Sequence, residues 1–166
     1  MLFIFVLFSC SNSFEESRIV EKVDKVIENV LVQSDSLKLN AAEGIVYYKG
    51  NPFNGTSITK YPNGIVAQSI EFQNGIRNGK YIKYFGDGRK SFEAIYRDNR
   101  QHGKTISWWS NGNKRSESNF EMGIASGYQM QWYISGAKFK KIHLVNGKEE
   151  GIQQSWRENG KLYKIE

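Results

Sequence analysis

Cysteine, proline and histidine are scarce in this chain. Its 166 residues include one cysteine, two prolines and two histidines. A lone cysteine leaves no internal disulfide, so the fold depends on packing alone. The histidines, His102 and His143, do not recur from unit to unit and share no spacing with cysteine that would predict a zinc site. We expect both to have surface or structural roles.

Motifs for catalysis and for cofactor binding are also missing. The glycines lack the following Lys-Ser/Thr of a phosphate-binding loop. Glu149–Glu150 is the only adjacent acidic pair in residues 44–166, and its place in a turn indicates solvated side chains rather than a catalytic pair. No serine has a recognisable base as partner. The sequence therefore predicts a protein that is not an enzyme and binds no cofactor or metal.

Long hydrophobic runs are missing, and the longest lies at residues 2–8. Seven residues are too few for a membrane-spanning helix, which needs about 20, but they fit the apolar core of a signal peptide. The run leads into Leu7–Phe8–Ser9–Cys10, which resembles a bacterial lipobox. The resemblance implies a signal peptide over residues 1–9 and acylation of Cys10, which would anchor the protein to a membrane. The alternatives are a buried strand or a fortuitous apolar start.

Residues 10–43 precede the main part of the chain. Residues 10–17 are polar and predict a flexible tether. Residues 18–32 predict a helix, because Ile19, Val23, Val26, Ile27 and Val30 fall on one helical face. With the linker that follows, this segment extends to residue 43. We expect the helix to cap one end of the structure, and the alternative is a helix that binds a partner.

Charge is unevenly distributed along the chain. Residues 10–43 carry a net charge of −3 and the whole chain carries +6, so residues 44–166 carry +9. Such a basic region would bind an anionic membrane or polysaccharide weakly and in a salt-dependent way. Nucleic acid is not expected as a partner, because the export signal argues against it and no recognition motif is present.

Glycine, in contrast, is abundant and periodic. One set recurs every 24 residues, and each member is followed nine residues later by a second glycine. The two sets are Gly55, Gly79, Gly103, Gly127 and Gly151, and Gly64, Gly88, Gly112, Gly136 and Gly160. A fixed period of this length indicates an array of one supersecondary unit. We expect all ten glycines to be structural turn residues.

Each unit is predicted to be a β-hairpin followed by a connecting turn. Between Gly79 and Gly103, residues 80–85 and 90–96 alternate as strands. Asn-Gly and Asp-Gly pairs at the hairpin tips suit turns in which both residues have positive φ. Asn99 replaces a glycine of the other connecting turns, which predicts positive φ there too. Stacked hairpins would form an all-β, extended antiparallel sheet of ten strands, about 45–50 Å long.

Aromatic residues recur in two adjacent columns. The first contains Tyr84, Trp108, Trp132 and Trp156, and the second contains Phe85, Trp109 and Tyr133. Because neighbouring strand residues point to opposite faces, we expect one column on each face of the sheet. Either both columns stabilise the sheet, or an exposed aromatic stripe flanked by lysine and arginine binds a protein edge or a glycan.

The unit resembles the bacterial MORN repeat variant. The segments that carry the resemblance are Asn111–Glu117, the connector Val145–Gly151 and residues 44–55, and the likeness extends over residues 44–166 in five repeats. It implies a scaffold that contacts proteins and, in some MORN proteins, membrane lipids. Many members of the family are labelled as antitoxins of toxin–antitoxin systems.

We therefore expect a non-catalytic, lipid-anchored protein of the bacterial cell envelope, on the outer membrane or the cell surface, whose β-repeat surface binds an unidentified protein. One alternative is an antitoxin or immunity protein that neutralises a toxin. Another is a module that binds anionic lipid or cell-wall glycan.

Overall fold

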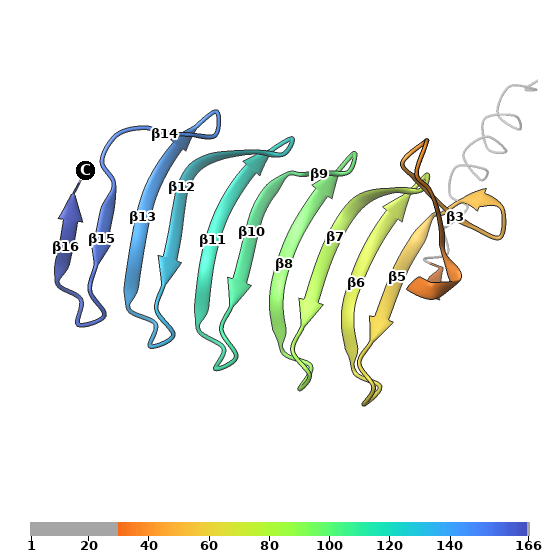
Figure 1. Ribbon diagram of the computed structural model, residues 1–166, viewed down its shortest axis with the longest axis horizontal. Coiled ribbons are helices and arrows are strands. Elements are labelled where there is room, and N and C mark those ends of the chain that lie inside the picture. The colour runs from red at the N-terminus through yellow and green to blue at the C-terminus, as the bar shows by residue number, and fades with distance from the viewer. Residues whose placement is uncertain (1–29, 166) are drawn as a thin grey trace, which may run out of the picture.

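The computed structural model describes residues 30–165, which are almost entirely β-strand (Figure 1). Thirteen strands form one sheet in the order β1-β5-β6-β7-β8-β10-β11-β12-β13-β15-β16, with β9 beside β8 and β14 beside β13. A second sheet has the order β2-β3-β4. The elements are β1 (Leu31–Gln33), η1 (Ser34–Ser36), β2 (Lys38–Asn40), β3 (Ile45–Tyr48), β4 (Asn51–Pro52), β5 (Gly55–Lys60), β6 (Val66–Gln73), β7 (Ile76–Tyr84), β8 (Lys90–Arg97), β9 (Arg100–Gln101), β10 (Gly103–Trp108), β11 (Lys114–Glu121), β12 (Ile124–Trp132), β13 (Lys138–Val145), β14 (Lys148–Glu149), β15 (Gln154–Trp156) and β16 (Leu162–Ile165).

The predicted extended antiparallel sheet of tandem hairpins is confirmed. Five hairpins follow one another along the chain: β5–β6, β7–β8, β10–β11, β12–β13 and β15–β16. They lie side by side in sequence order, so each hairpin contacts only its neighbours (Figure 1). This is the nearest-neighbour arrangement of a repeat array.

The helix predicted over residues 18–32 is wrong at its C-terminal end. Residues 31–33 form β1, which pairs in parallel with β5, and the Thr56 N–H donates to the Val30 carbonyl at 2.9 Å. Val32 is buried in this strand, where a β-branched side chain packs better than in a helix. A strand therefore covers the N-terminal edge of the array. The predictions for residues 1–29, which are the signal peptide, Cys10, the tether and the rest of the helix, lie outside the described residues.

The segment expected to be a linker contains ordered elements. The Ser34 hydroxyl in η1 donates to the Ile58 carbonyl at 2.8 Å, and β2 joins the three-stranded sheet. After this sheet comes Phe53, which is 2% exposed and lies 5.9 Å from the Tyr48 ring and 5.7 Å from the Phe72 ring. Phe53 is the most deeply buried large side chain among the described residues.

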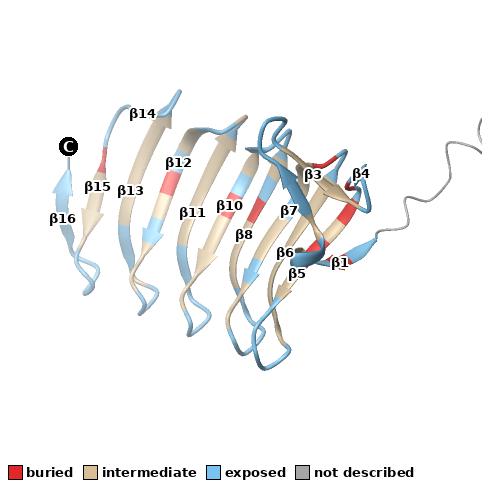
Figure 2. Cartoon of the chain, turned by 45° about the vertical axis from the view of Figure 1, so that its right-hand side comes forward, coloured by how far each residue is buried: buried red, intermediate tan, exposed pale blue. Residues whose placement is uncertain are grey.

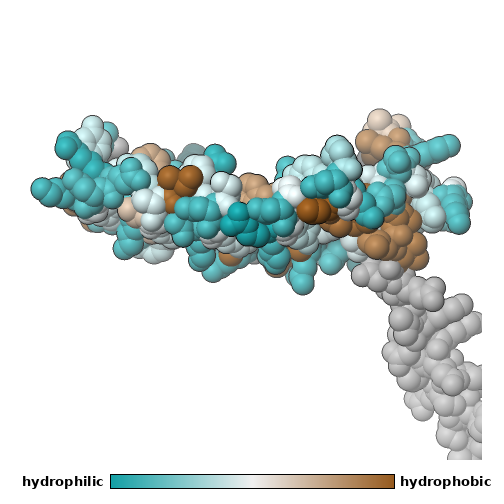
Figure 3. Space-filling model, turned by 90° about the horizontal axis from the view of Figure 1, so that it is seen from below, coloured by the Kyte–Doolittle hydropathy of each residue, from teal (hydrophilic) through white to brown (hydrophobic). Residues whose placement is uncertain are grey.

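The long sheet is a single layer. Only four apolar side chains of the described residues are buried, namely Val32, Phe53, Ile58 and Ala94. Most strand residues are of intermediate exposure (Figure 2), and the array seen from below is a thin slab covered largely by hydrophilic side chains (Figure 3). Packing between neighbouring side chains and the backbone ladder therefore stabilise the repeats, rather than one large core.

The hairpin tips differ from the prediction of two positive-φ residues. Gly64 has φ of 84° and its N–H donates to the Tyr61 carbonyl at 2.9 Å, but Asn63 is not among the positive-φ residues. The Asn63 side-chain oxygen instead accepts a hydrogen bond from the Ile65 N–H at 3.1 Å. Asparagine is thus favoured by this local hydrogen bond, and only glycine supplies the left-handed conformation. Asp87, Asn111 and Asn159 accept the same bond.

The connecting turns are the ones that use two positive-φ residues. Asn99 has φ of 63°, as its replacement of glycine predicts, and Asp98 before it has φ of 48°. The Asn99 N–H donates to the Arg77 carbonyl at 3.0 Å, and the Gly123 N–H donates to the Gln101 carbonyl at 2.7 Å. Each bond ties a connecting turn to the residue that lies two positions before the first glycine of the same unit.

Candidate functional site

The two faces of the long sheet carry different side chains. Strand alternation places Tyr84, Trp108, Trp132 and Trp156 on one face, which we call the tryptophan face. The other face, which we call the glycine face, carries the first glycine set and the buried side chain of Thr105. Phe72, which contacts Phe53, lies opposite Gly55 and so belongs to the glycine face.

The first aromatic column alternates with lysines across the tryptophan face. Cross-strand partners are Tyr84 with Lys90, Trp108 with Lys114, and Trp132 with Lys138. With adjacent strands about 4.8 Å apart, an aromatic ring recurs roughly every 10 Å along the array. We call this alternating set, from Tyr84 to Trp156, the aromatic–lysine row.

Lysines of this row also contact the ring of the next repeat. The Lys114 ammonium lies 5.7 Å from the Trp132 ring centroid, and the Lys138 ammonium lies 5.8 Å from that of Trp156. At these distances the cation is attracted by the negative face of the indole. Lys114 and Lys138 therefore each bridge two repeats, and the row is continuous from Trp108 to Trp156.

Acidic side chains neutralise part of this row. Glu117 accepts a hydrogen bond from Lys104 at 2.8 Å and from Lys114 at 2.6 Å, and these bonds hold its pKa below the usual value. Glu93 accepts from Lys90 at 2.7 Å. One repeat further on, the equivalent position is Lys141, whose ammonium lies 4.1 Å from the Tyr128 ring centroid. The tryptophan face is therefore more basic toward the C-terminal repeats.

The second aromatic column lies on the glycine face and connects the repeats. The Trp109 indole N–H donates to the Trp132 carbonyl at 3.1 Å, and the Tyr133 hydroxyl donates to the Trp156 carbonyl at 3.0 Å. Tyr61, which the sequence analysis did not select, donates to the Tyr84 carbonyl at 2.8 Å. Phe85 has no donor for the equivalent bond. This column therefore has a structural role at the hairpin ends.

The glycine face also contains a pocket of about 350 Å³. Its lining residues are Ser107, Trp109, Arg115, Ser116, Gln131, Trp132 and Phe139. Sequence reasoning selected two of the three aromatic residues but neither the serines nor Arg115 nor Phe139. The available signal was the small size of Ser116, because the equivalent positions of the two preceding repeats and the following one hold Gln68, Phe92 and Lys140.

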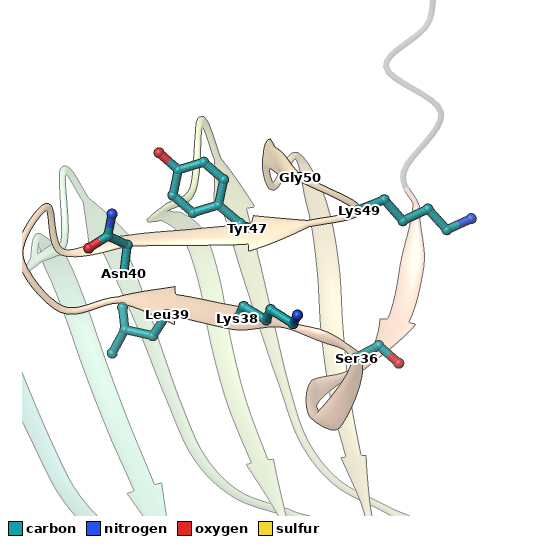
Figure 4. A pocket seen from close by; sticks show the side chains of 7 residues that line it. All are labelled: Ser36, Lys38, Leu39, Asn40, Tyr47, Lys49 and Gly50. Carbon is teal, nitrogen blue, oxygen red and sulfur yellow. The ribbon is translucent and has the colours of Figure 1, made fainter.

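A third surface lies on the three-stranded sheet, where a pocket of about 430 Å³ is lined by Ser36, Lys38, Leu39, Asn40, Tyr47, Lys49 and Gly50 (Figure 4). The Tyr47 hydroxyl donates to the Glu43 carboxylate at 2.6 Å, which raises the pKa of Tyr47. Leu39 points away from Tyr47 in this view. Within residues 30–165, no cluster of three or more histidine, cysteine or acidic side chains could hold a metal ion.

All ten glycines of the two periodic sets have positive φ. Gly55 is confined by backbone, because a Cβ there would meet the Val30 carbonyl oxygen as well as the Phe53 ring. Gly103 is open, with no atom within 4 Å of such a Cβ. The requirement for glycine is therefore conformational at Gly103 and both conformational and steric at Gly55.

Together, a single-layer array of β-hairpins with two accessible faces defines a repeat protein that acts as a binding module. The family model of the MORN repeat variant matches residues 53–74, 101–122 and 149–166. The chain therefore contains repeats of the MORN variant type. No curated protein matches its sequence. None of the helices described in the structure is long and apolar enough to cross a membrane.

Proposed function

We propose that this protein is a non-catalytic adaptor whose tryptophan face binds another protein. The aromatic–lysine row is the observation that supports this proposal most directly. Tryptophan, tyrosine and basic side chains are the residues that most often dominate protein interfaces. Among residues 30–165, no segment packs over this row between β7 and β15. Its rings are half-buried by their neighbours, so they are held in place and still present one surface to a partner.

The charge of this face indicates the chemistry of the partner. Glu93 and Glu117 neutralise lysines in the middle of the row, whereas Lys138 and Lys141 are not matched by a glutamate at the position equivalent to Glu117. A partner with apolar side chains and an acidic end over β12–β15 fits this distribution. Such a contact would weaken as salt concentration rises.

Membrane anchoring is the second part of the proposal. This part rests on the sequence that ends in Cys10. It proposes that the array lies at a bacterial envelope, on the outer membrane or the cell surface. Acylation at Cys10 would hold the array close to the membrane, where even a modest affinity for a neighbouring envelope protein produces a complex.

The test is crosslinking and pull-down of the full-length protein from cells. The variants are the double variant Trp108→Ala/Trp132→Ala, Lys83→Gln on the glycine face as a control, and Cys10→Ala. We expect one envelope protein to be captured by the wild type and Lys83→Gln, and at least about 30-fold less by the double variant, as for loss of a hot spot. Circular dichroism must first show that the double variant retains the sheet.

Other outcomes distinguish the alternatives. A soluble toxin bound one to one, and captured equally by Cys10→Ala, would replace the anchored adaptor with an antitoxin. Salt-sensitive binding to anionic vesicles without a captured protein would replace it with a lipid-binding module. Equal capture of one protein by the wild type and by the folded double variant would refute the assignment to the tryptophan face.

A further inference from the structure

The pocket on the glycine face exists because one repeat departs from its neighbours. In the repeat before it, the paired positions hold Lys83 and Phe92, and the Phe92 ring lies 5.6 Å from the Tyr81 ring. In the pocket the same positions hold Ser107 and Ser116, whose hydroxyl oxygens are 2.6 Å apart. Two small polar side chains replace a large ring, and a hollow of about 350 Å³ remains.

Flat groups form the walls of this hollow. On one side the Arg115 guanidinium carbon lies 4.8 Å from the Trp109 ring centroid, and on the other Phe139 lies 5.0 Å from Tyr133. The indole of Trp109 is held by its hydrogen bond to the Trp132 carbonyl. One repeat earlier the position of Arg115 is occupied by Ser91, so the walls as well as the floor are particular to this pocket.

Donors and acceptors remain available at its floor and rim. The two serine hydroxyls share one proton between them, which leaves the second proton free to donate. Gln131 is exposed, and neither its amide nor the Arg115 guanidinium has a hydrogen-bond or ion-pair partner among residues 30–165. An apolar side chain of a partner protein would cover these groups without bonding them, which is unfavourable.

We propose that this pocket binds a pyranose sugar that carries a carboxylate group. The flat C–H faces of a pyranose ring pack against the Trp109 and Phe139 rings, and its edge hydroxyls bond to the serines and to Gln131. The Arg115 guanidinium matches a carboxylate with two parallel hydrogen bonds. The pocket opens on the glycine face, although Trp132 of the aromatic–lysine row also lines it. A sugar site goes beyond the proposed protein contact. Substitutions at Arg115 and Ser116 change the pocket and leave the row intact, so either proposal can fail without the other.

The test compares each acidic sugar with a neutral counterpart that lacks the carboxylate. One pair is N-acetylmuramic acid and N-acetylglucosamine, and the second is methyl glucuronide and methyl glucoside. The full chain is titrated with each while the Trp109 indole N–H and the Gln131 side-chain amide are followed by NMR. We expect saturable shifts with the acidic sugars and affinities at least about tenfold weaker for the neutral ones. The pair with the tighter acidic member shows whether a lactyl ether or a ring carboxyl is preferred.

Three variants complete the test. Ser116→Phe restores the residue that the preceding repeat carries and should abolish sugar binding while the sheet stays folded, as circular dichroism would show. Arg115→Gln should remove the preference for the acidic sugar of each pair, and Lys83→Gln, on the same face but outside the pocket, should change nothing. The proposal is overturned if no acidic sugar shifts the Trp109 resonance, if acidic and neutral sugars bind alike, or if folded Ser116→Phe binds as the wild type does.

Discussion

Phe85→Tyr would supply a hydrogen bond that the array makes elsewhere and lacks between its second and third repeats. Tyr61, Trp109 and Tyr133 each donate to a carbonyl 23 residues further along the chain, at 2.8, 3.1 and 3.0 Å. By the same geometry a hydroxyl on residue 85 would reach the Trp108 carbonyl. One such bond contributes about 0.5–1.5 kcal/mol. For a protein of this size, each kcal/mol raises the midpoint of thermal unfolding by roughly 2–4 °C.

The reverse change, Tyr133→Phe, should cost more than Phe85→Tyr gains. It removes a bond and leaves the half-buried Trp156 carbonyl without that donor, which costs about 1–3 kcal/mol. Tyr163→Phe is the control, because the Tyr163 hydroxyl makes no hydrogen bond within residues 30–165 and the residue is 63% exposed. We expect this control to change stability by less than about 0.5 kcal/mol.

Urea unfolding followed by circular dichroism measures the three variants. Because repeat arrays unfold from the least stable junction, amide hydrogen exchange in β8 and β10 should slow selectively in Phe85→Tyr. The reasoning is refuted if Phe85→Tyr leaves both urea midpoint and exchange unchanged, or if Tyr133→Phe is as stable as Tyr163→Phe.

Three further predictions concern the turns and one ion-pair cluster. Met122 has φ of 46°, so Met122→Asn should raise stability by up to about 1 kcal/mol, and a lower urea midpoint would contradict this. Gly103→Ala should lower the free energy of unfolding by about 1–2 kcal/mol, because alanine disfavours positive φ. Gly55→Ala should lower it further, because its Cβ also meets a backbone carbonyl. Equal urea midpoints for the two variants would contradict the steric argument for Gly55. Hydrogen bonds, first from Lys104, lower the pKa of Glu117 below 4.5 in the folded protein. The ionised Glu117 carboxylate therefore stabilises the folded protein above pH 4.5, and this contribution is lost as the pH falls through the lower pKa of the folded state. Glu117→Gln should lower the free energy of unfolding by less than about 1 kcal/mol at pH 7. It should also make stability depend less on pH on the acid side.

The hairpin array was predictable because glycine marks both kinds of turn in every repeat. A turn residue that needs positive φ is restricted by its own backbone, so its spacing is visible without knowledge of the fold. The finer geometry was harder to read. Asn63 and Gly64 look like a pair with positive φ, but the Asn63 side chain can also accept a local hydrogen bond, and the register of the hairpin decides between the two.

The strand β1 was not predictable from its own residues. Apolar side chains at helical spacing and β-branched side chains point to different structures for the segment that ends at Val32. The open edge of β5 settles the matter, because its backbone donors need partners and Thr56 finds one in the Val30 carbonyl. A partner that lies 26 residues away along the chain does not appear in a local pattern.

The candidate surfaces were predictable where they follow the period and unpredictable where they break it. Strand alternation assigned the Trp108 and Trp109 columns to opposite faces. It did not show that the second column donates hydrogen bonds to the backbone of the next repeat, because that requires the relative placement of two hairpins. The pocket at Ser116 was missed because aligning the repeats draws attention to shared residues, and the positions equivalent to Ser116 have no residue common to all repeats.

Under the proposed function, the two aromatic columns divide stability and binding between them. Each hydrogen-bonding member of the second column, such as Tyr133, ties its hairpin end to the next, so substitution there should lower stability first. In the first column, Trp132 and Trp156 make cation–π contacts with lysines, which are individually weak at exposed sites. A first-column ring can thus be removed at lower cost to the sheet than a second-column donor. Positions that contribute little to folding yet keep a large aromatic ring in each of four successive repeats are where a binding surface is to be sought.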